Sequence, residues 1–133
     1  MWRRLKRLGV AQLLDGLVAL PLDARNKEQL EWVADQVTEA GGAASVWIGH
    51  LASSSDELGI ISTMAEAIAQ EYRALIVEAA SARQADEGAR RRVLARLRRE
   101  LRRIRYRDHF PPPQADEARR ALDDLASLAE VGG

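Results

Sequence analysis

Apolar side chains recur at three- and four-residue intervals through the second half of the chain, and this spacing restricts that half to helices. The first run comprises Ile61, Met64, Ile68, Tyr72, Leu75 and Ala79. A second run follows an interruption at Ala85–Gly88 and comprises Val93, Leu94, Leu97, Leu101 and Ile104. Pro111-Pro112-Pro113 must end that second helix, because proline has no amide N–H and cannot continue a helical ladder.

Two further signals delimit this helical part. The polar stretch Ser53-Ser54-Ser55-Asp56 offers N-cap residues for the first helix. A last helix is predicted over Gln114–Val131, with Ala118, Leu122, Leu125 and Ala129 facing inward. We therefore expect residues 53–133 to form a helical part, either as an antiparallel bundle or as a cover for one side of a sheet.

The N-terminal residues predict a short helix and a β-hairpin. Trp2–Leu8 suits a short helix with a basic outer face, which Gly9 would end as a C-cap. Val10–Leu14 and Leu17–Leu20 are apolar runs separated by Asp15-Gly16, which predicts a hairpin with a type I′ turn.

A helix and a third strand are predicted next. Asn26 is a plausible N-cap for a helix over Lys27–Ala40, with Gly41-Gly42 as its stop. Ala44–Leu51 is rich in strand-forming residues, so the segments from Leu17 to Leu51 predict a βαβ unit with parallel strands. The predicted class is α+β, with a small α/β sheet part at 1–52 and a helical part at 53–133, together one compact domain of 133 residues.

Several function classes lack support in the sequence. No cysteine is present, which excludes disulfides and thiolate chemistry. No catalytic, phosphate-loop or metal-binding motif occurs, and His50 reads as a structural residue near a strand end. No apolar run is long enough to span a bilayer, and the basic Met1–Arg7 is not followed by a signal-peptide core. We expect a cytoplasmic, non-enzymatic protein with no catalytic residue, metal or cofactor.

Charge is strongly segregated although the chain as a whole is neutral. Residues 89–109 hold ten arginines against Glu100 and Asp108, a net charge of +8. The preceding residues 51–88 carry −5 and the following residues 110–133 carry −3. Two interpretations remain open: the acidic helices neutralise the arginine helix within the fold, or its outer face meets phosphates or a small oxyanion.

The predicted oxyanion site lies on and just after the arginine helix. Arg92, Arg96, Arg99 and Arg103 recur at helical spacing and form a row outside the apolar stripe. Guanidinium groups stay charged at physiological pH and bind oxyanions in a bidentate manner. Tyr106 and His109, in the sequence RYRDHF, could complete a pocket or could instead anchor the turn into the prolines.

A second basic element is predicted to contact a DNA backbone. It consists of Arg3, Arg4, Lys6 and Arg7. Such charges would give salt-sensitive affinity for phosphates without reading sequence.

Taken together, these motifs resemble the N-terminal region of the chromate resistance protein ChrB. The likeness rests on WRRLKRLG at 2–9, LDGLVALP at 14–21, LEW at 30–32, AGG at 40–42 and the arginine helix with Phe110-Pro111, and it covers nearly all of the chain. The segment WRRLKRLG with its hairpin is also similar to the C-terminal part of PaaX-like repressors. The resemblance implies a ferredoxin-like N-terminal part and a chromate-responsive regulator of a chromate resistance operon.

Two departures from the family pattern matter. Family members usually carry a hydrophobic strand before WRRLKRLG, central in the sheet, and longer members carry a further C-terminal domain. Without that strand we expect a late start, a three-stranded sheet in which Leu17–Leu20 and Ser45–His50 pair directly, or an edge completed by a partner chain. A homodimer is therefore expected, and a dimerisation or scaffolding module without ligand is the alternative function.

Overall fold

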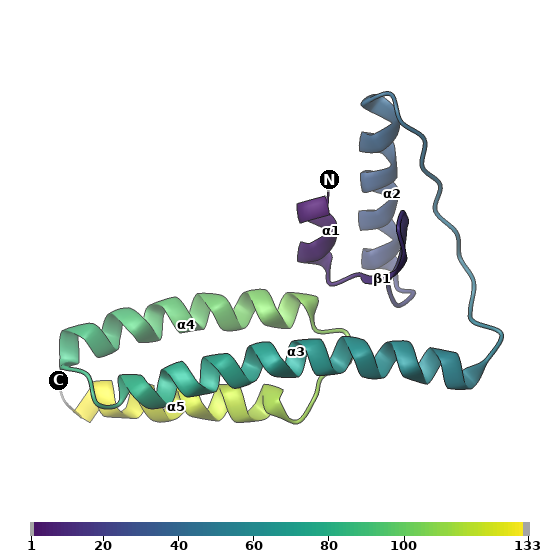
Figure 1. Cartoon of the computed structure of the whole chain (residues 1–133). Coiled ribbons are helices and arrows are strands. Elements are labelled where there is room, and N and C mark those ends of the chain that lie inside the picture. The colour runs from purple at the N-terminus through teal and green to yellow at the C-terminus, as the bar shows by residue number, and fades with distance from the viewer. Residues whose placement is uncertain (1, 132–133) are drawn as a thin grey trace. The chain divides into compact units, whose positions relative to one another are not determined.

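The computed structural model describes residues 2–131, with the side chains of 2–128, as an α+β chain dominated by helices (Figure 1). Residues 1–60 and 61–133 are two compact units, which are described separately. The first unit contains α1 (Trp2–Leu8), β1 (Ala11–Leu14), β2 (Leu17–Ala19), α2 (Ala24–Glu39) and the start of α3 (Ser54–Ala82). The second contains the rest of α3 with α4 (Glu87–Arg107) and α5 (Gln114–Val131).

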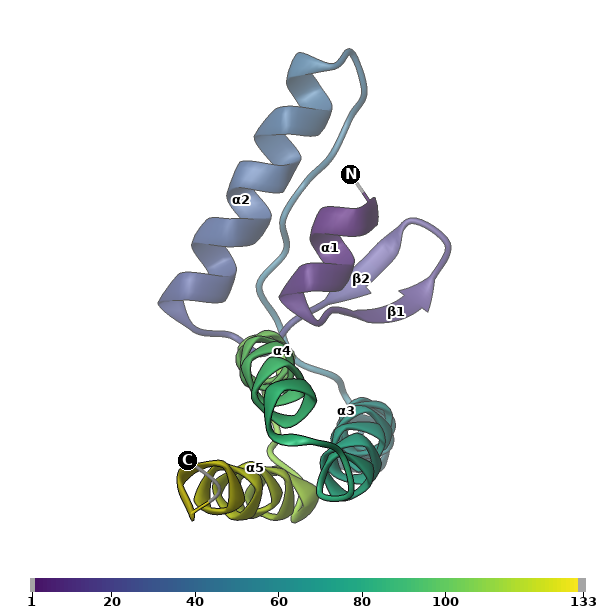
Figure 2. The same cartoon turned by 90° about the vertical axis from the view of Figure 1, so that its left-hand side faces the viewer.

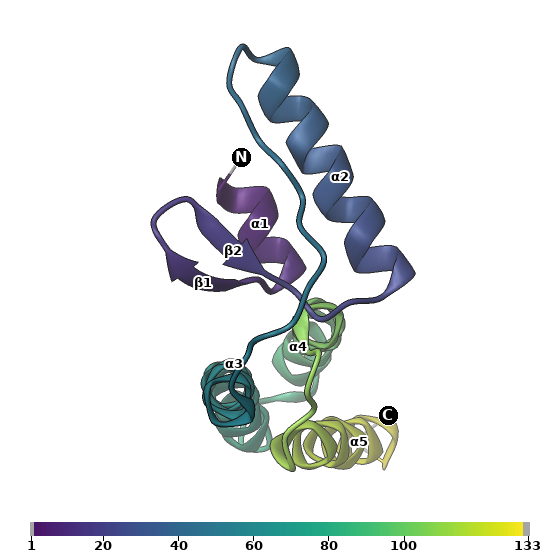
Figure 3. The ribbon, with the colours of Figure 1, turned by 90° about the vertical axis from the view of Figure 1, so that its right-hand side faces the viewer.

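The second unit is a bundle of three helices. α3 and α5 run in the same direction and α4 runs opposite to both (Figure 1), and end-on views show the three axes as a triangle (Figures 2 and 3). Each helix contributes to one apolar core. The core side chains from α3 are Ile68, Tyr72, Leu75, Ala79 and Ala82; those from α4 are Leu94, Leu97, Leu101 and Ile104; those from α5 are Ala118, Leu122 and Leu125. These residues confirm most of the predicted apolar stripes. Ile61 and Met64 are only partly buried and lie outside the core, and Val93 packs against it without being fully buried. The side chain of Ala129 lies outside the described residues.

The breaks between these helices follow the sequence signals. The N–H of Asp56 donates to Ser53 Oγ (3.2 Å) at the start of α3. Asp86 caps α4 by accepting the N–H of Ala89 on its carboxylate (2.8 Å). The interruption predicted at Ala85–Gly88 occurs slightly earlier, at residues 83–86, and Gly88 lies within the first turn of α4. α5 has the predicted bounds. No described helix is both long enough and apolar enough to cross a membrane.

In the first unit, α1 and the hairpin form as predicted, but the turn type differs. β1 and β2 pair antiparallel, with Ala11 opposite Ala19 and Gln12 opposite Val18. A type I′ turn needs positive φ at both central residues. Gly16 has a positive φ (+80°), but Asp15 does not, since no described non-glycine residue has a positive φ. The type I′ prediction is therefore wrong. The pairing shifts between Gln12 and Leu14, which accommodates the different turn.

The predicted N-cap of α2 is also wrong. Asp23, not Asn26, caps the helix: its carboxylate accepts the N–H of Asn26 at 2.7 Å, and α2 begins at Ala24. Asn26 is instead buried in the first turn, where its Nδ2 donates to the Pro21 carbonyl (2.9 Å) and to Asp23 (3.2 Å). Asp23 and Asn26 are both common N-cap residues. With Asp23 as the cap, the side-chain amide of Asn26 can donate to the Pro21 carbonyl and so fix the chain that leads into the helix.

The strand predicted over Ala44–Leu51 is not formed. The only described sheet is the two-stranded β1–β2 hairpin, so neither a βαβ unit nor a three-stranded sheet is present among residues 2–131. Residues 43–51 run as an extended trace after α2 (Figure 3). A strand requires a hydrogen-bonded neighbour as well as strand-forming residues, and this segment has none in the described chain.

Candidate functional site

α4 separates its side chains into an apolar face and an arginine face. Leu94, Leu97, Leu101 and Ile104 are buried in the three-helix core. At about 100° per residue, the row Arg92, Arg96, Arg99 and Arg103 falls on the opposite side of the helix, and all four side chains are exposed. The structure therefore brings the predicted row together on one solvent-facing surface.

Acidic residues of the same chain engage some of the arginines. Ion pairs join Arg91 to Glu87 (2.5 Å), Arg96 to Glu78 of α3 (2.6 Å), Arg103 to Glu100 (3.9 Å) and Arg107 to Glu71 of α3 (2.5 Å). The first interpretation of the charge segregation, neutralisation within the fold, therefore applies to these four arginines. Two of the paired residues, Arg96 and Arg103, belong to the predicted row. The long Arg103–Glu100 pair is easily exchanged because the Arg103 side chain is 70% exposed.

Five exposed arginines form what we call the α4 arginine face. Arg92, Arg98, Arg99 and Arg102 are exposed and make no ion pair with a carboxylate of the described chain, and Arg103 adjoins them. Arg99 lies three residues before Arg102 and four before Arg103, so these three guanidinium groups are neighbours on the helix surface. Repulsion among them favours any anion that is placed between them.

Tyr106 and His109 relate differently to this face. Tyr106 lies three residues after Arg103 and four after Arg102, and its side chain is 43% exposed, so the residue lies on the same side of the helix. His109 follows the end of α4 and is half-buried, and it is not part of the helical row. The structure thus groups Tyr106 with the arginines and places His109 in the turn toward the prolines.

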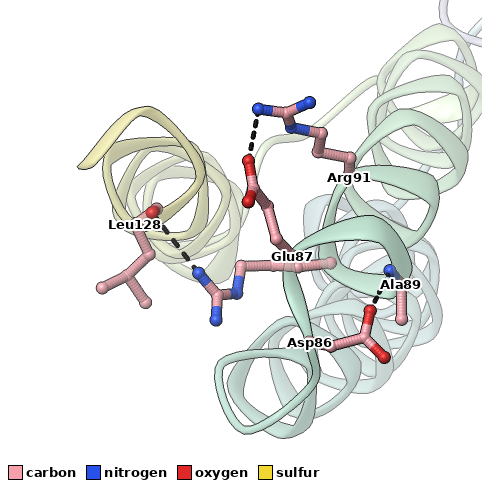
Figure 4. A network of polar contacts seen from close by, with 6 residues as sticks. Asp86, Glu87, Ala89, Arg91 and Leu128 are labelled. Carbon is pink, nitrogen blue, oxygen red and sulfur yellow. Dashed lines mark hydrogen bonds and ion pairs between the residues drawn. The ribbon is translucent and has the colours of Figure 1, made fainter. Parts of the chain in front are cut away.

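The N-terminal end of α4 is held by polar contacts with its surroundings (Figure 4). Asp86 caps the first turn and Glu87 pairs with Arg91. The Arg90 guanidinium donates to the Leu128 carbonyl of α5 (3.3 Å) and to the Ala85 carbonyl (2.9 Å). Arg90 therefore joins α4 to α5 and is not available to a ligand.

The C-terminal end of α4 is tied to α3 by a buried hydroxyl. Tyr72 is fully buried, and its hydroxyl donates to Asp108 Oδ2 at 2.7 Å. Burial and the Asp108 carboxylate raise the pKa of Tyr72 well above its ordinary value, because both disfavour the phenolate, and Arg105 and Arg107 oppose this weakly. Sequence reasoning assigned Tyr72 only to the core; an apolar-stripe position occupied by tyrosine is the signal that it needs a polar partner.

The basic residues of α1 are not equivalent. Arg3, Lys6 and Arg7 are exposed, whereas the Arg4 guanidinium lies over the Trp32 ring at 3.4 Å from its centroid and donates to Gln29 (3.3 Å). This cation–π contact packs α1 on α2. Of the four residues predicted to meet a DNA backbone, Arg4 therefore has a structural role. Arg3 and Arg7 are exposed, and the exposed Lys6 places its ammonium over the Trp2 ring, 5.4 Å from the centroid.

Within residues 2–128, no three His, Asp or Glu side chains are grouped so as to hold a metal ion. Comparison of the chain with protein-family models, with curated proteins and with solved structures found no match.

Proposed function

We propose that this chain is a non-enzymatic regulatory module that binds an oxyanion, chromate or a related tetrahedral dianion, through the α4 arginine face. The observation that carries the proposal is the group of neighbouring exposed guanidiniums at Arg99, Arg102 and Arg103, of which the first two make no ion pair in the described chain. Three such groups can donate several charge-assisted hydrogen bonds to one tetrahedral anion, with the Tyr106 hydroxyl as a further donor.

The resemblance to ChrB supplies the regulatory context of this proposal. In it, the module controls a chromate resistance operon in the cytoplasm, and the exposed cations of α1 contact the DNA backbone. The ferredoxin-like architecture of the first unit is part of the same proposal and requires strands beyond the β1–β2 hairpin. The exposure of Arg3, Lys6 and Arg7 supports this contact, which would be to phosphates and not to base edges.

Calorimetric titration with chromate, sulfate and phosphate at low ionic strength tests the anion site. The double variant Arg99→Gln/Arg103→Gln should weaken binding at least about tenfold, because it removes two of three converging cations. The matched control Arg119→Gln/Arg120→Gln removes the same charge from α5. An equal loss in both double variants, or no heat with any of the three anions at millimolar concentration, would reject the site.

An electrophoretic shift assay at two salt concentrations tests the DNA contact. Each phosphate contact contributes about −0.9 to the slope of log K against log salt, so Arg3→Gln/Lys6→Gln should make the slope shallower by about 1.8. Chromate should change the shift if the two sites are coupled. A slope that this double variant leaves unchanged would remove α1 from the interface.

Dimerisation is the second candidate function. It is favoured by the large apolar side chains that the first unit leaves exposed, among them Leu14, Leu22 and Trp47. A homodimer would cover such side chains with or without a bound anion.

A further inference from the structure

The segment after α2 is extended and has no hydrogen-bonded neighbour. Between the bond from Gly42 N–H to the Val37 carbonyl and the bond from Glu57 N–H to the Ser53 carbonyl, no backbone–backbone hydrogen bond occurs in the described chain. Residues 43–52 include no proline, so this stretch offers ten successive amides that make no backbone–backbone hydrogen bond in the described chain. Such a run of unpaired N–H and C=O groups can accept another strand.

The residues of this segment are those of a buried strand and not those of a loop. Val46, Trp47 and Ile48 are β-branched or aromatic, yet the Trp47 side chain is 88% exposed and that of Ile48 is 59% exposed. Trp47 makes only a local contact, from its Nε1 to Ser45 Oγ (2.9 Å). The backbone of the segment is therefore unpaired in the described chain, and its largest side chains are exposed, with Val46 partly buried.

The β1–β2 hairpin of the same chain does not pair with this segment. A cavity of about 90 Å³ lies between the segment and the residues that connect β2 to α2, and it is lined by Leu20, Leu22 and Leu30 on one side and by Val46 and Ile48 on the other. β2 itself is only three residues long. Direct pairing with β2 would leave most of residues 44–51 unpaired.

We propose that residues 44–51 of two copies of this chain pair antiparallel about a twofold axis and join the two first units into a dimer. The segment carries no charged side chain between Glu39 and Asp56 when His50 is neutral, so pairing it with itself places no like charges opposite one another. A partner strand carrying Lys, Arg, Asp or Glu would bring unpaired charge against this apolar surface.

The self-pairing also has a favourable alignment. With Trp47 opposite Trp47, Val46 of each copy lies opposite Ile48 of the other, and these pairs fall on the opposite face from the tryptophans. One face then carries an aromatic pair and the other a continuous β-branched surface. A shift by one residue places Ile48 opposite Ile48 but Trp47 opposite Gly49, which loses the aromatic pair. This inference deepens the dimerisation alternative and does not depend on the anion site.

Sedimentation equilibrium from about 1 µM to about 1 mM, a range that covers weak to moderate association, tests the proposal. The wild-type mass should rise toward that of a dimer. Ile48→Lys should weaken association at least about tenfold, because two lysines would then enter one apolar face. The matched control Val77→Lys changes a side chain of α3 that is 64% exposed, and it should associate like the wild type.

Hydrogen exchange at the two ends of that concentration range identifies the surface. Amides 44–51 should exchange slowly only in the dimer. A monomer at every concentration, a dimer that Ile48→Lys does not weaken, or a dimer in which these amides still exchange freely would overturn the proposal. Slow exchange in a monomer would also overturn it, because another strand would then occupy the segment. Calorimetry with sulfate on Ile48→Lys separates this result from failure of the anion site, since that variant keeps the α4 arginine face intact.

Discussion

Removal of one buried hydroxyl should measure how firmly the C-terminal end of α4 is held. Tyr72→Phe deletes the group that donates to Asp108 Oδ2 at 2.7 Å and leaves the ring in the core. Asp108 Oδ1 is already buried without a hydrogen-bond partner. The variant also removes the donor to Oδ2, so neither carboxylate oxygen keeps the Tyr72 hydrogen bond or gains another in its place. The perturbation is therefore an uncompensated carboxylate and not a cavity.

The expected magnitude follows from the kind of bond that is lost. A hydrogen bond to a charged group contributes about 1.5–3 kcal/mol to the free energy of unfolding. Asp108 is only half-buried, and the positive charges of Arg105 and Arg107 act on the same site, so the lower end of that range applies. We expect a loss of about 1.5 kcal/mol, or about 6–12 °C in Tm for a cooperative unit of this size.

Urea denaturation followed by far-UV circular dichroism measures this loss. The slope m should be unchanged, because the surface exposed on unfolding is almost the same. Tyr106→Phe serves as the control, since its side chain is 43% exposed, and it should change stability by less than about 0.5 kcal/mol. A Tyr72→Phe loss below about 0.5 kcal/mol would show that the buried bond contributes nothing and refute the reasoning.

The remaining predictions concern pH, the core and the first unit. Because the pKa of Tyr72 is raised in the folded state, its contribution is fully present below pH 10, the ordinary tyrosine value, and declines above it; Tyr72→Phe should show a smaller loss of stability above pH 10 than the wild type. Leu97→Ala should cost about 2–5 kcal/mol in urea denaturation, whereas Leu58→Ala, at an exposed position, should cost less than about 0.5 kcal/mol. Arg4→Gln should destabilise the first unit by about 1 kcal/mol through loss of its contact with Trp32, and Arg3→Gln should not; equal effects in thermal melts would contradict this assignment.

The helices were predictable because the residues that start, pattern and end each helix lie within or next to it in the sequence. The apolar stripe of α4, the proline run that ends it and the glycine positions that end α1 and α2 act over a few residues, and local spacing shows them. The cap of α2 was less predictable. Asp23 and Asn26 are both capping residues three positions apart, and the choice between them depends on the contact of Asn26 with the Pro21 carbonyl.

The absence of the third strand and the ion pairs between α3 and α4 could not be predicted from local pattern. Residues 44–51 have strand-forming side chains, but a strand also needs a neighbour, and nothing within the segment specifies one. The spacing of Arg92, Arg96, Arg99 and Arg103 predicted their shared face. Which of them meets a carboxylate depends on how far α4 is displaced along α3, and that is decided by core packing between helices.

The two ion pairs between α3 and α4 limit how the second unit can respond to a bound anion. Glu78 meets Arg96 near the middle of α4, and Glu71 meets Arg107 at its last turn. A piston-like slide of α4 by one turn, about 5.4 Å, would part both pairs at once and also draw Tyr72 away from Asp108. An anion bound at the proposed site would therefore change the electrostatic potential of the α4 surface without shifting the helix.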